Sequence, residues 1–350
     1  MTQHENPGMA FRLTSAQLDQ FFSGLSQTFR LYAPTRFRQR GRFSDTDCIR
    51  YADIRTPDEI EWREKSDFSP KEIVFPVNQS LFQFVNGAWI EPAIDERPVL
   101  VFLRACDING IDRLDTIFLE NGERDPYYDR LRAKVHFVLL ECQQSFDTCF
   151  CVSMGTNTTD NYEMALRLYD DGTAEALIRS EDVRQRVPAD TVKTAFAPIF
   201  PTQDGSPVEL PPIDELTAAI REDDFFDHPM WEEYSQRCIA CGRCNFSCPT
   251  CSCFTTLDAA YDENPQFGER RRVWAGCHVD KFTDMAGGHQ YRREYGSRMR
   301  FKTMHKIYDY HLRFGKQMCV GCGRCDDQCP EYIAFSTCIN TVSRTLKEGR

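Results

Sequence analysis

The chain has 350 residues, of which 41% are apolar and 27% charged, which fits about two or three globular domains and excludes disordered and fibrous proteins. Its net charge is −11, and no apolar run approaches the roughly 18 residues that cross a bilayer, so we expect no membrane partner. Residues 1–10 are polar and lack the apolar stretch of a secretory signal, so we expect a cytoplasmic protein.

A packing helix is predicted near the N-terminus. Thr14 can cap it, Gln17 lies in its first turn, and apolar residues follow at helical spacing. These residues are Leu18, Phe21, Phe22, Leu25 and Phe29. Residues 35–97 mix arginine, proline and short β-rich pieces, and we expect irregular strands there, at 72–77 and 81–85.

A strand, a helix and a second strand follow in the pattern of a βαβ unit. Residues 99–103 are continuously apolar, residues 107–119 carry apolar side chains at helical spacing, and residues 135–140 form a second apolar run. The two strands are expected to be parallel neighbours. Cys106 and Cys142 would then lie just past their carboxyl ends, at the edge where open α/β sheets bind ligands.

The fold class predicted from these patterns is α+β. Asp171-Gly172 lies between two short strands and is a hairpin signal. The proline-rich residues 198–212 suit neither a helix nor a central strand and are interpreted as a domain linker. Residues 1–197 would form an N-terminal α/β domain with the βαβ-like unit, and residues 213–350 a mainly helical domain. The hairpin strands are expected at 164–169 and 174–178, and the C-terminal helices at 213–221, 230–237 and 298–314.

The chain contains 17 cysteines, far more than packing requires. A disulfide framework is the ordinary alternative, but the expected compartment is reducing, the count is odd, and a chain of this length can bury a core without cross-links. Metal ligation is therefore the leading interpretation of the cysteines.

The pattern C-x2-C-x2-C-x3-C-P occurs twice and is typical of ferredoxins that bind two [4Fe-4S] clusters. In such proteins the fourth cysteine of each run binds the other cluster, which places the two clusters close together. We therefore assign Cys238, Cys241, Cys244 and Cys329 to a first cluster, and Cys319, Cys322, Cys325 and Cys248 to a second. Gly242 and Gly323 would let backbone amides approach the sulfide ions.

Zinc is the alternative metal for these cysteines. A zinc site uses two C-x2-C pairs, however, and leaves the third cysteine and the proline of each run unexplained. The segment between the two runs, residues 249–318, has a helical rather than a hairpin-like pattern. This pattern favours an all-helical dicluster ferredoxin domain, similar to the iron-sulfur subunit of succinate dehydrogenase, over the small bacterial ferredoxin sandwich.

The segment 264–318 is basic, with 12 Lys and Arg against 5 Asp and Glu, although the whole chain is acidic. Guanidinium groups there could offset the charge of each cluster, formally about −2 when oxidised, or could bind an acidic partner. The arginines concerned are Arg270, Arg271, Arg272, Arg292, Arg293, Arg298 and Arg300. We expect no nucleic-acid partner, because a chain with a pI near 5.2 repels phosphate backbones.

Four cysteines of the N-terminal domain are candidates for a third site. They are Cys106, Cys142, Cys149 and Cys151: the first two share a sheet edge, and the C-x-C pair follows in the next loop. The spacing C-x-C alone is weakly diagnostic, and packing as small apolar residues stays the alternative. We interpret Cys251, Cys253 and Cys277-His278 as packing around the clusters, Cys48 and Cys338 as structural, and the histidines as isolated.

The sequence resembles the iron-sulfur electron-transfer subunit of the NADH-dependent anaerobic sulfite reductases, a family related to the β subunit of soluble [NiFe] sulfhydrogenases. The resemblance covers about residues 100–330, and the segments that carry it are 104–115, 147–156, 248–254, 284–289 and 319–327. Residues 158–162, Thr-Thr-Asp-Asn-Tyr, favour the sulfite reductase branch. The resemblance also supports a third [4Fe-4S] cluster at Cys106, Cys142, Cys149 and Cys151.

The resemblance implies a protein that transfers electrons within a complex, and not an enzyme on its own. Its partners would be a sirohaem-containing subunit that reduces sulfite to sulfide, together with a flavin- and NAD-binding subunit. We find no nucleotide-binding motif and no catalytic acid, base and nucleophile set, so no catalytic residue is assigned.

Three alternatives stay open. The chain could be the equivalent subunit of a [NiFe] hydrogenase, an iron-sulfur sensor that binds nucleic acid through residues 264–318, or an autonomous oxidoreductase. The complete set of four cysteines at each ferredoxin site argues against the last, because it leaves no open iron there.

Overall fold

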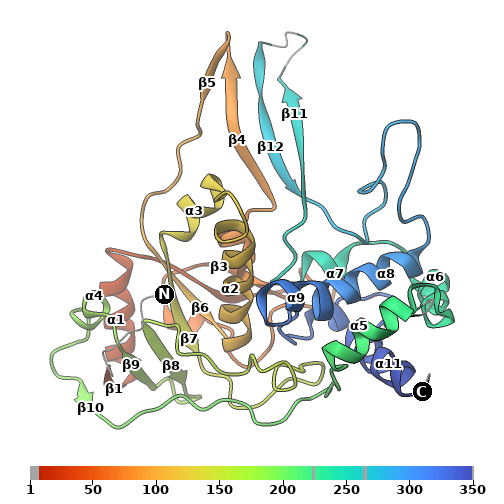
Figure 1. Cartoon of the computed structure of the whole chain (residues 1–350). Coiled ribbons are helices and arrows are strands. Elements are labelled where there is room, and N and C mark those ends of the chain that lie inside the picture. The colour runs from red at the N-terminus through yellow and green to blue at the C-terminus, as the bar shows by residue number, and fades with distance from the viewer. Residues whose placement is uncertain (1–7, 223–224, 262, 264–265, 349–350) are drawn as a thin grey trace.

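An eight-stranded mixed sheet forms the core of the N-terminal half (Figure 1). The computed structural model describes residues 8–222, 225–261, 263 and 266–348, so most of the segment on which the leader prediction rests, residues 1–7, lies outside it. The strand order is β10-β1-β9-β8-β7-β6-β2-β3. The strands are β1 (Met9–Leu13), β2 (Arg30–Phe37), β3 (Cys48–Ile54), β6 (Val99–Leu103), β7 (Val135–Leu140), β8 (Met164–Leu168), β9 (Ala174–Ile178) and β10 (Val192–Lys193).

The predicted βαβ unit is confirmed. Strands β6 and β7 pair in parallel, and helix α2 (Ala105–Leu119) connects them, followed by α3 (Pro126–Arg132). Every residue of β6 is buried, because alternate side chains enter hydrophobic cores on the two faces of the sheet. The carboxyl ends of both strands therefore meet at one edge of the sheet.

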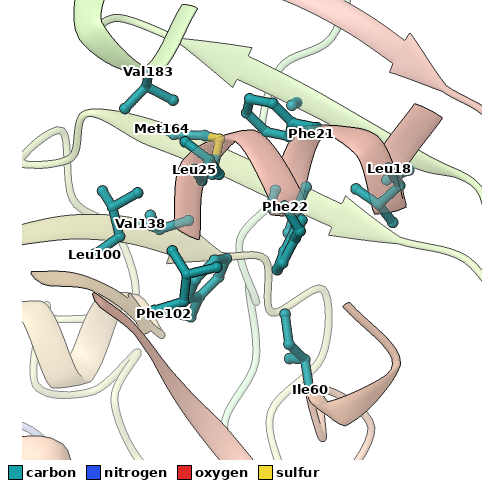
Figure 2. Close-up of a cluster of buried hydrophobic side chains, with 14 of the residues drawn as sticks. Leu18, Phe21, Phe22, Leu25, Ile60, Leu100, Phe102, Val138, Met164 and Val183 are labelled. Carbon is teal, nitrogen blue, oxygen red and sulfur yellow. The ribbon is translucent and has the colours of Figure 1, made fainter. Parts of the chain in front are cut away.

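Helix α1 (Ser15–Ser26) covers one face of this sheet (Figure 2). Thr14 and Gln17 form the predicted capping box at its start. Phe22 stacks on Phe102 of β6 with ring centroids 5.6 Å apart, within a core that also takes Met164. Helix α2 packs on the opposite face, so the sheet lies between the two helices.

The predicted hairpin is observed, and residues 198–212 are irregular as their prolines predict. Strands β8 and β9 pair antiparallel around the turn at Gly172, whose φ is +78°. Residues 198–212 contain no helix or strand. The segment is nevertheless docked, because the Asp204 carboxylate accepts hydrogen bonds from the backbone amides of Val152 and Ser153 at 2.8 and 2.7 Å. Helix α4 (Glu181–Arg184) lies between β9 and β10.

A four-stranded antiparallel sheet, in the order β11-β12-β4-β5, projects from the body of the molecule (Figure 1). It joins β4 (Asn78–Val85) and β5 (Ala88–Ile90) to β11 (Phe254–Ala260) and β12 (Phe267–Trp274). The expectation of a helical segment after the first cysteine run is therefore wrong for this part. The charged run in β12 masks the strand pattern, and its partner β4 lies far away in sequence.

The strand expected at 72–77 is likewise wrong, whereas the one at 81–85 lies within β4. Pro70 begins a 3₁₀ turn, Pro70–Ile73, because its fixed φ suits the first position of a helical turn. A second such turn is Pro57–Glu59.

Short helices make up most of the remaining C-terminal part. They are α5 (Ile213–Glu222), α6 (Glu232–Arg237), α7 (Arg243–Phe246), α8 (Tyr295–Met304), α9 (Tyr310–Phe314), α10 (Arg324–Asp327) and α11 (Phe335–Glu348), with 3₁₀ turns at Phe225–Asp227 and Pro229–Trp231. A π-helical segment, His305–Asp309, joins α8 to α9. The helices expected at 213–221, 230–237 and 298–314 are present. None of the described helices has the length and apolar character needed to cross a bilayer.

A buried ion pair joins the two halves of the molecule. Arg324, at the start of α10, donates to both carboxylate oxygens of Asp107 in α2 at 2.6 and 2.8 Å. The two side chains are 1% and 0% exposed. Nearby, Gly110 of α2 lies against Pro249, where an added Cβ would approach the proline ring to 2.8 Å. Helix α2 is thus fixed against both cysteine runs.

Asp107→Ala is expected to destabilise the protein by about 3–5 kcal/mol, because it leaves the Arg324 guanidinium buried without its partner. Anaerobic chemical denaturation of the full chain measures the effect. Asp258→Ala, which breaks the exposed pair with Arg270, is the control and should change the unfolding midpoint little. Equal midpoints for the two variants would contradict this role of the buried pair.

Candidate iron-sulfur centres

Four cysteines from both runs surround a first cavity. Cys238 follows α6, Cys241 and Cys244 lie on either side of Gly242, and Cys329 follows α10. These four line a small cavity with mainly apolar walls. Gly242 has a φ of +72° and caps α7, so its backbone freedom lets the run turn between the second and third cysteines.

The remaining four ferredoxin cysteines meet at a second small cavity. They are Cys248, Cys319, Cys322 and Cys325. Each cavity therefore takes three cysteines from one run and its fourth from the other, which is the crossed arrangement expected from the motif. Gly323, with a φ of +71°, again turns the run, and an added Cβ would lie 2.3 Å from the carbonyl oxygen of Thr148.

The geometry of these cavities suits a cubane better than a zinc ion. Four thiolates around one zinc lie about 2.3 Å from a single point. Among the described residues, no group of three His, Cys, Asp or Glu side chains converges in a way that would hold one metal ion. The cysteines instead surround each cavity without meeting at one point, which suits several iron ions better than one.

Three buried lysines surround the cysteines, and no sequence motif marks them. Lys302 and Lys306 follow one another on α8 and the π-helical segment, and Lys71 comes from the 3₁₀ turn near β4. They are 4%, 3% and 2% exposed. In the described part of the chain none of the three forms a salt bridge with a carboxylate. Lys71 Nζ donates to the backbone carbonyls of Asn245 and Cys251 at 3.3 and 3.0 Å and lines neither cavity. A buried ammonium without a carboxylate partner is costly, so Lys302 and Lys306, which line the cavities, fit anionic clusters there.

The expectation that arginines of the basic segment surround the clusters is wrong, because none of the seven lines either cavity. Arg270 and Arg271 pair with Asp258 and Glu269 within the projecting sheet. Arg272, Arg298 and Arg300 pair with Asp125, Asp280 and Asp227 respectively. The positive charge at the cavities comes instead from Lys302 and Lys306, which line them.

Burial keeps most of the cavity thiols protonated in the absence of metal. It raises the pKa of Cys319 to about 12 and that of Cys322 to about 11. Cys248 is the exception: a hydrogen bond from Cys251 and the nearby Lys306 and Lys71 hold its pKa well below the usual value. Because cluster ligands must be thiolates, cluster assembly would release protons from these sites.

The third predicted set is also brought together, beside the second cavity. Cys106, in the first turn of α2, packs with Cys151 against Val320 and Cys322. The Cys149 Sγ lies 3.5 Å from the carbonyl oxygen of Cys322 and 3.8 Å from Lys65 Nζ. Cys142 and Cys149 interact electrostatically with each other and with Cys151.

Cys142 is the outermost member of this set. It is partly exposed, and its Sγ donates to the carbonyl oxygen of Gln144 at 3.2 Å. It lines an open cavity at the carboxyl ends of β6 and β7, as the βαβ pattern predicts. Cys241 of the first cavity is also exposed.

Comparison with known proteins agrees with this geometry. A family model described as a 4Fe-4S dicluster domain matches residues 237–333. The chain is 28% identical to sulfhydrogenase 2 subunit beta of Pyrococcus furiosus over 349 residues, which is 96% of this chain and 98% of that protein. No solved structure matches the chain. The chain is related over its full length to a hydrogenase beta subunit, and both matches support an iron-sulfur electron-transfer subunit.

The remaining cysteines lie where packing was expected. The Asn245 side-chain amide donates to the sulfurs of Cys251 and Cys277 at 3.6 and 3.4 Å. Cys338 is fully buried against Thr303, and Cys48 is buried in β3. His278 is not isolated, contrary to expectation: it lines the first cavity with its Nδ1 3.6 Å from Cys238 Sγ, and burial lowers its pKa to about 3.

Cys241→Ser and Cys322→Ser should each remove one cluster, about four irons per chain, and lower the melting temperature, because a cluster in each cavity would stabilise the folded chain. Iron and sulfide analysis with anaerobic thermal melting checks this. Cys338→Ser, which changes a buried cysteine outside both cavities, should keep the full iron content. Unchanged iron and melting in either ligand variant would show that the assignment is wrong.

Proposed function

We propose that the chain relays electrons between two partner subunits of an oxidoreductase complex and performs no substrate chemistry alone. The observation that carries this proposal is that the three cysteine sets lie side by side, with a cysteine near the surface at each end. Cys142 lies partly exposed at the sheet edge, Cys106 packs against Cys322 of the second cavity, and Cys241 of the first cavity is exposed. Lys302 and Phe335 line both ferredoxin cavities, so the two cavities share a wall one side chain thick.

The twelve cysteines of these sets would hold three [4Fe-4S] clusters, each of which stores and passes one electron. The first two follow from the dicluster domain. The third, at Cys106, Cys142, Cys149 and Cys151, is supported by the gathering of these thiols and by the Lys65 ammonium beside Cys149. That cluster would extend the relay from the ferredoxin cavities to the edge of the N-terminal sheet.

A hydrogenase complex is the first candidate for the partners. The relative that aligns over almost the whole chain is named as a sulfhydrogenase beta subunit. A hydrogen-activating subunit would then exchange electrons with a flavin- and NAD(H)-binding subunit through this chain.

An anaerobic sulfite reductase is the second candidate. Residues 158–162, which follow the Cys149-Phe150-Cys151 loop, favour that branch of the related families. The chain would then connect a flavin- and NAD(H)-binding subunit to a sirohaem subunit that reduces sulfite to sulfide. The cytoplasmic location and the absence of nucleic-acid and membrane partners stay predictions from the sequence.

The isolated chain should accept electrons from dithionite but should neither reduce sulfite nor evolve hydrogen. When added to a complex that lacks its relay subunit, it should restore NADH-driven turnover. Restored hydrogen evolution would identify the hydrogenase partner, and restored sulfite reduction would identify the sulfite reductase partner. Turnover of either substrate by the chain alone, with an artificial donor, would refute a pure relay.

The third cluster can be tested in the full chain. Cys106→Ser and Cys149→Ser should each lower the iron and sulfide content by about four atoms per chain, whereas Cys48→Ser, a buried cysteine of β3, should not. Both contents are measured on anaerobically purified protein. Full iron content in both variants would show that these thiols are packing residues only.

A further inference from the structure

Lys302 of α8 lies between the two ferredoxin cavities. Its side chain lines the first cavity, together with Cys244, and also the second, together with Cys325. It is 4% exposed, and its Nζ lies 4.8 Å from the centroid of the Phe335 ring, which also lines both cavities. The ammonium group is therefore enclosed between the two proposed clusters.

No carboxylate of the described residues neutralises this ammonium, because no Asp or Glu oxygen among them lies within 4.0 Å of Lys302. The groups beside Lys302 that can carry negative charge are cysteine sulfurs of both cavities, Cys244 in the first and Cys325 in the second.

Each oxidised cluster with four thiolates carries formally about −2, and reduction adds one further negative charge. A fixed positive charge close to a cluster therefore stabilises the reduced state more than the oxidised state and raises the reduction potential. A charge placed between two clusters acts on both of them.

We propose that Lys302 is the shared electrostatic partner of the two ferredoxin clusters and raises both reduction potentials together. It is a positioning residue for electron transfer, since it changes the energy of the electron at each cluster without binding iron. The proposal rests on the two clusters of the dicluster domain and is independent of the partner subunits and of the third cluster.

Lys306 offers a matched comparison. It lies four residues further along, is 3% exposed, and its Nζ donates to Thr250 Oγ1 at 2.7 Å. Lys306 lines the second cavity and not the first. A neutral residue at 306 should therefore affect one cluster, whereas a neutral residue at 302 should affect two.

The experiment is an anaerobic redox titration of the full chain followed by electron paramagnetic resonance. The Cys241→Ser variant identifies the signal of the first cluster, and the Cys322→Ser variant that of the second. Lys302→Met should lower the reduction equilibrium constant of both clusters about tenfold, a shift of about 59 mV for a one-electron couple. Lys306→Met should shift only the second signal, and the exposed Lys347→Met should shift neither.

Lys302→Arg keeps the charge and should keep both potentials near those of the parent protein, which separates charge from packing. Where Lys302→Met fails to retain its iron, Lys302→Gln provides a second neutral side chain for the same titration. Unchanged potentials in the neutral variant, a shift of one signal alone, or an equal shift in Lys302→Arg would overturn the proposal.

Discussion

The crossing of the two cysteine runs is the constraint on which the structure depends. Each cavity takes three cysteines from one run and its fourth from the other, so neither site can be complete until residues 238–248 and 319–329 have come together. The sequence between the two cysteine runs can therefore form other strands and helices. It supplies two strands of the projecting sheet, then α8, which places Lys302 at both cavities, and the π-helical segment, which places Lys306 at the second.

Burial of negative charge explains much of what surrounds this crossing. A group with formal charge near −2 is costly in a dry interior unless cations and hydrogen-bond donors are close. Lys302, Lys306 and Lys71 supply the cations, and the last of these comes from the N-terminal half of the chain. The Asp107–Arg324 pair adds a second connection between the halves, because it fixes α2 and its Cys106 against the second cysteine run. The two halves are thus joined by the same groups that build the sites.

Local patterns predict the parts of the fold that depend on neighbouring residues. The capping box at Thr14, the βαβ unit and the β8–β9 hairpin all follow from short-range spacing, and so does the grouping of the ferredoxin cysteines. Cys106 and Cys142 can be placed at one sheet edge because parallel strands align their carboxyl ends. The fold inferences need only nearby residues and one geometric rule, whereas the exchange of the fourth cysteine comes from the ligation pattern of the doubled motif.

Elements that depend on residues far away in the sequence cannot be predicted from local patterns in this way. Strand β12 pairs with β4, almost 200 residues earlier in the sequence, and its run of charged residues hides the alternation of a strand. The lysines at the cavities are equally hidden, since a lysine on a helix is most often solvated and only the tertiary structure shows that Lys302 is enclosed. Arginines are the usual partners of buried anions, which is why the seven arginines draw attention in the sequence, although five of them pair with carboxylates instead.

The most direct test of the crossed arrangement asks which cluster is lost with each fourth cysteine. In anaerobically reduced protein, Cys329→Ser should abolish the same paramagnetic signal as Cys241→Ser, although Cys329 belongs to the other run. Cys248→Ser should likewise match Cys322→Ser. If Cys329→Ser instead removed the signal that Cys322→Ser removes, each run would bind its own cluster, and the crossed arrangement would be contradicted.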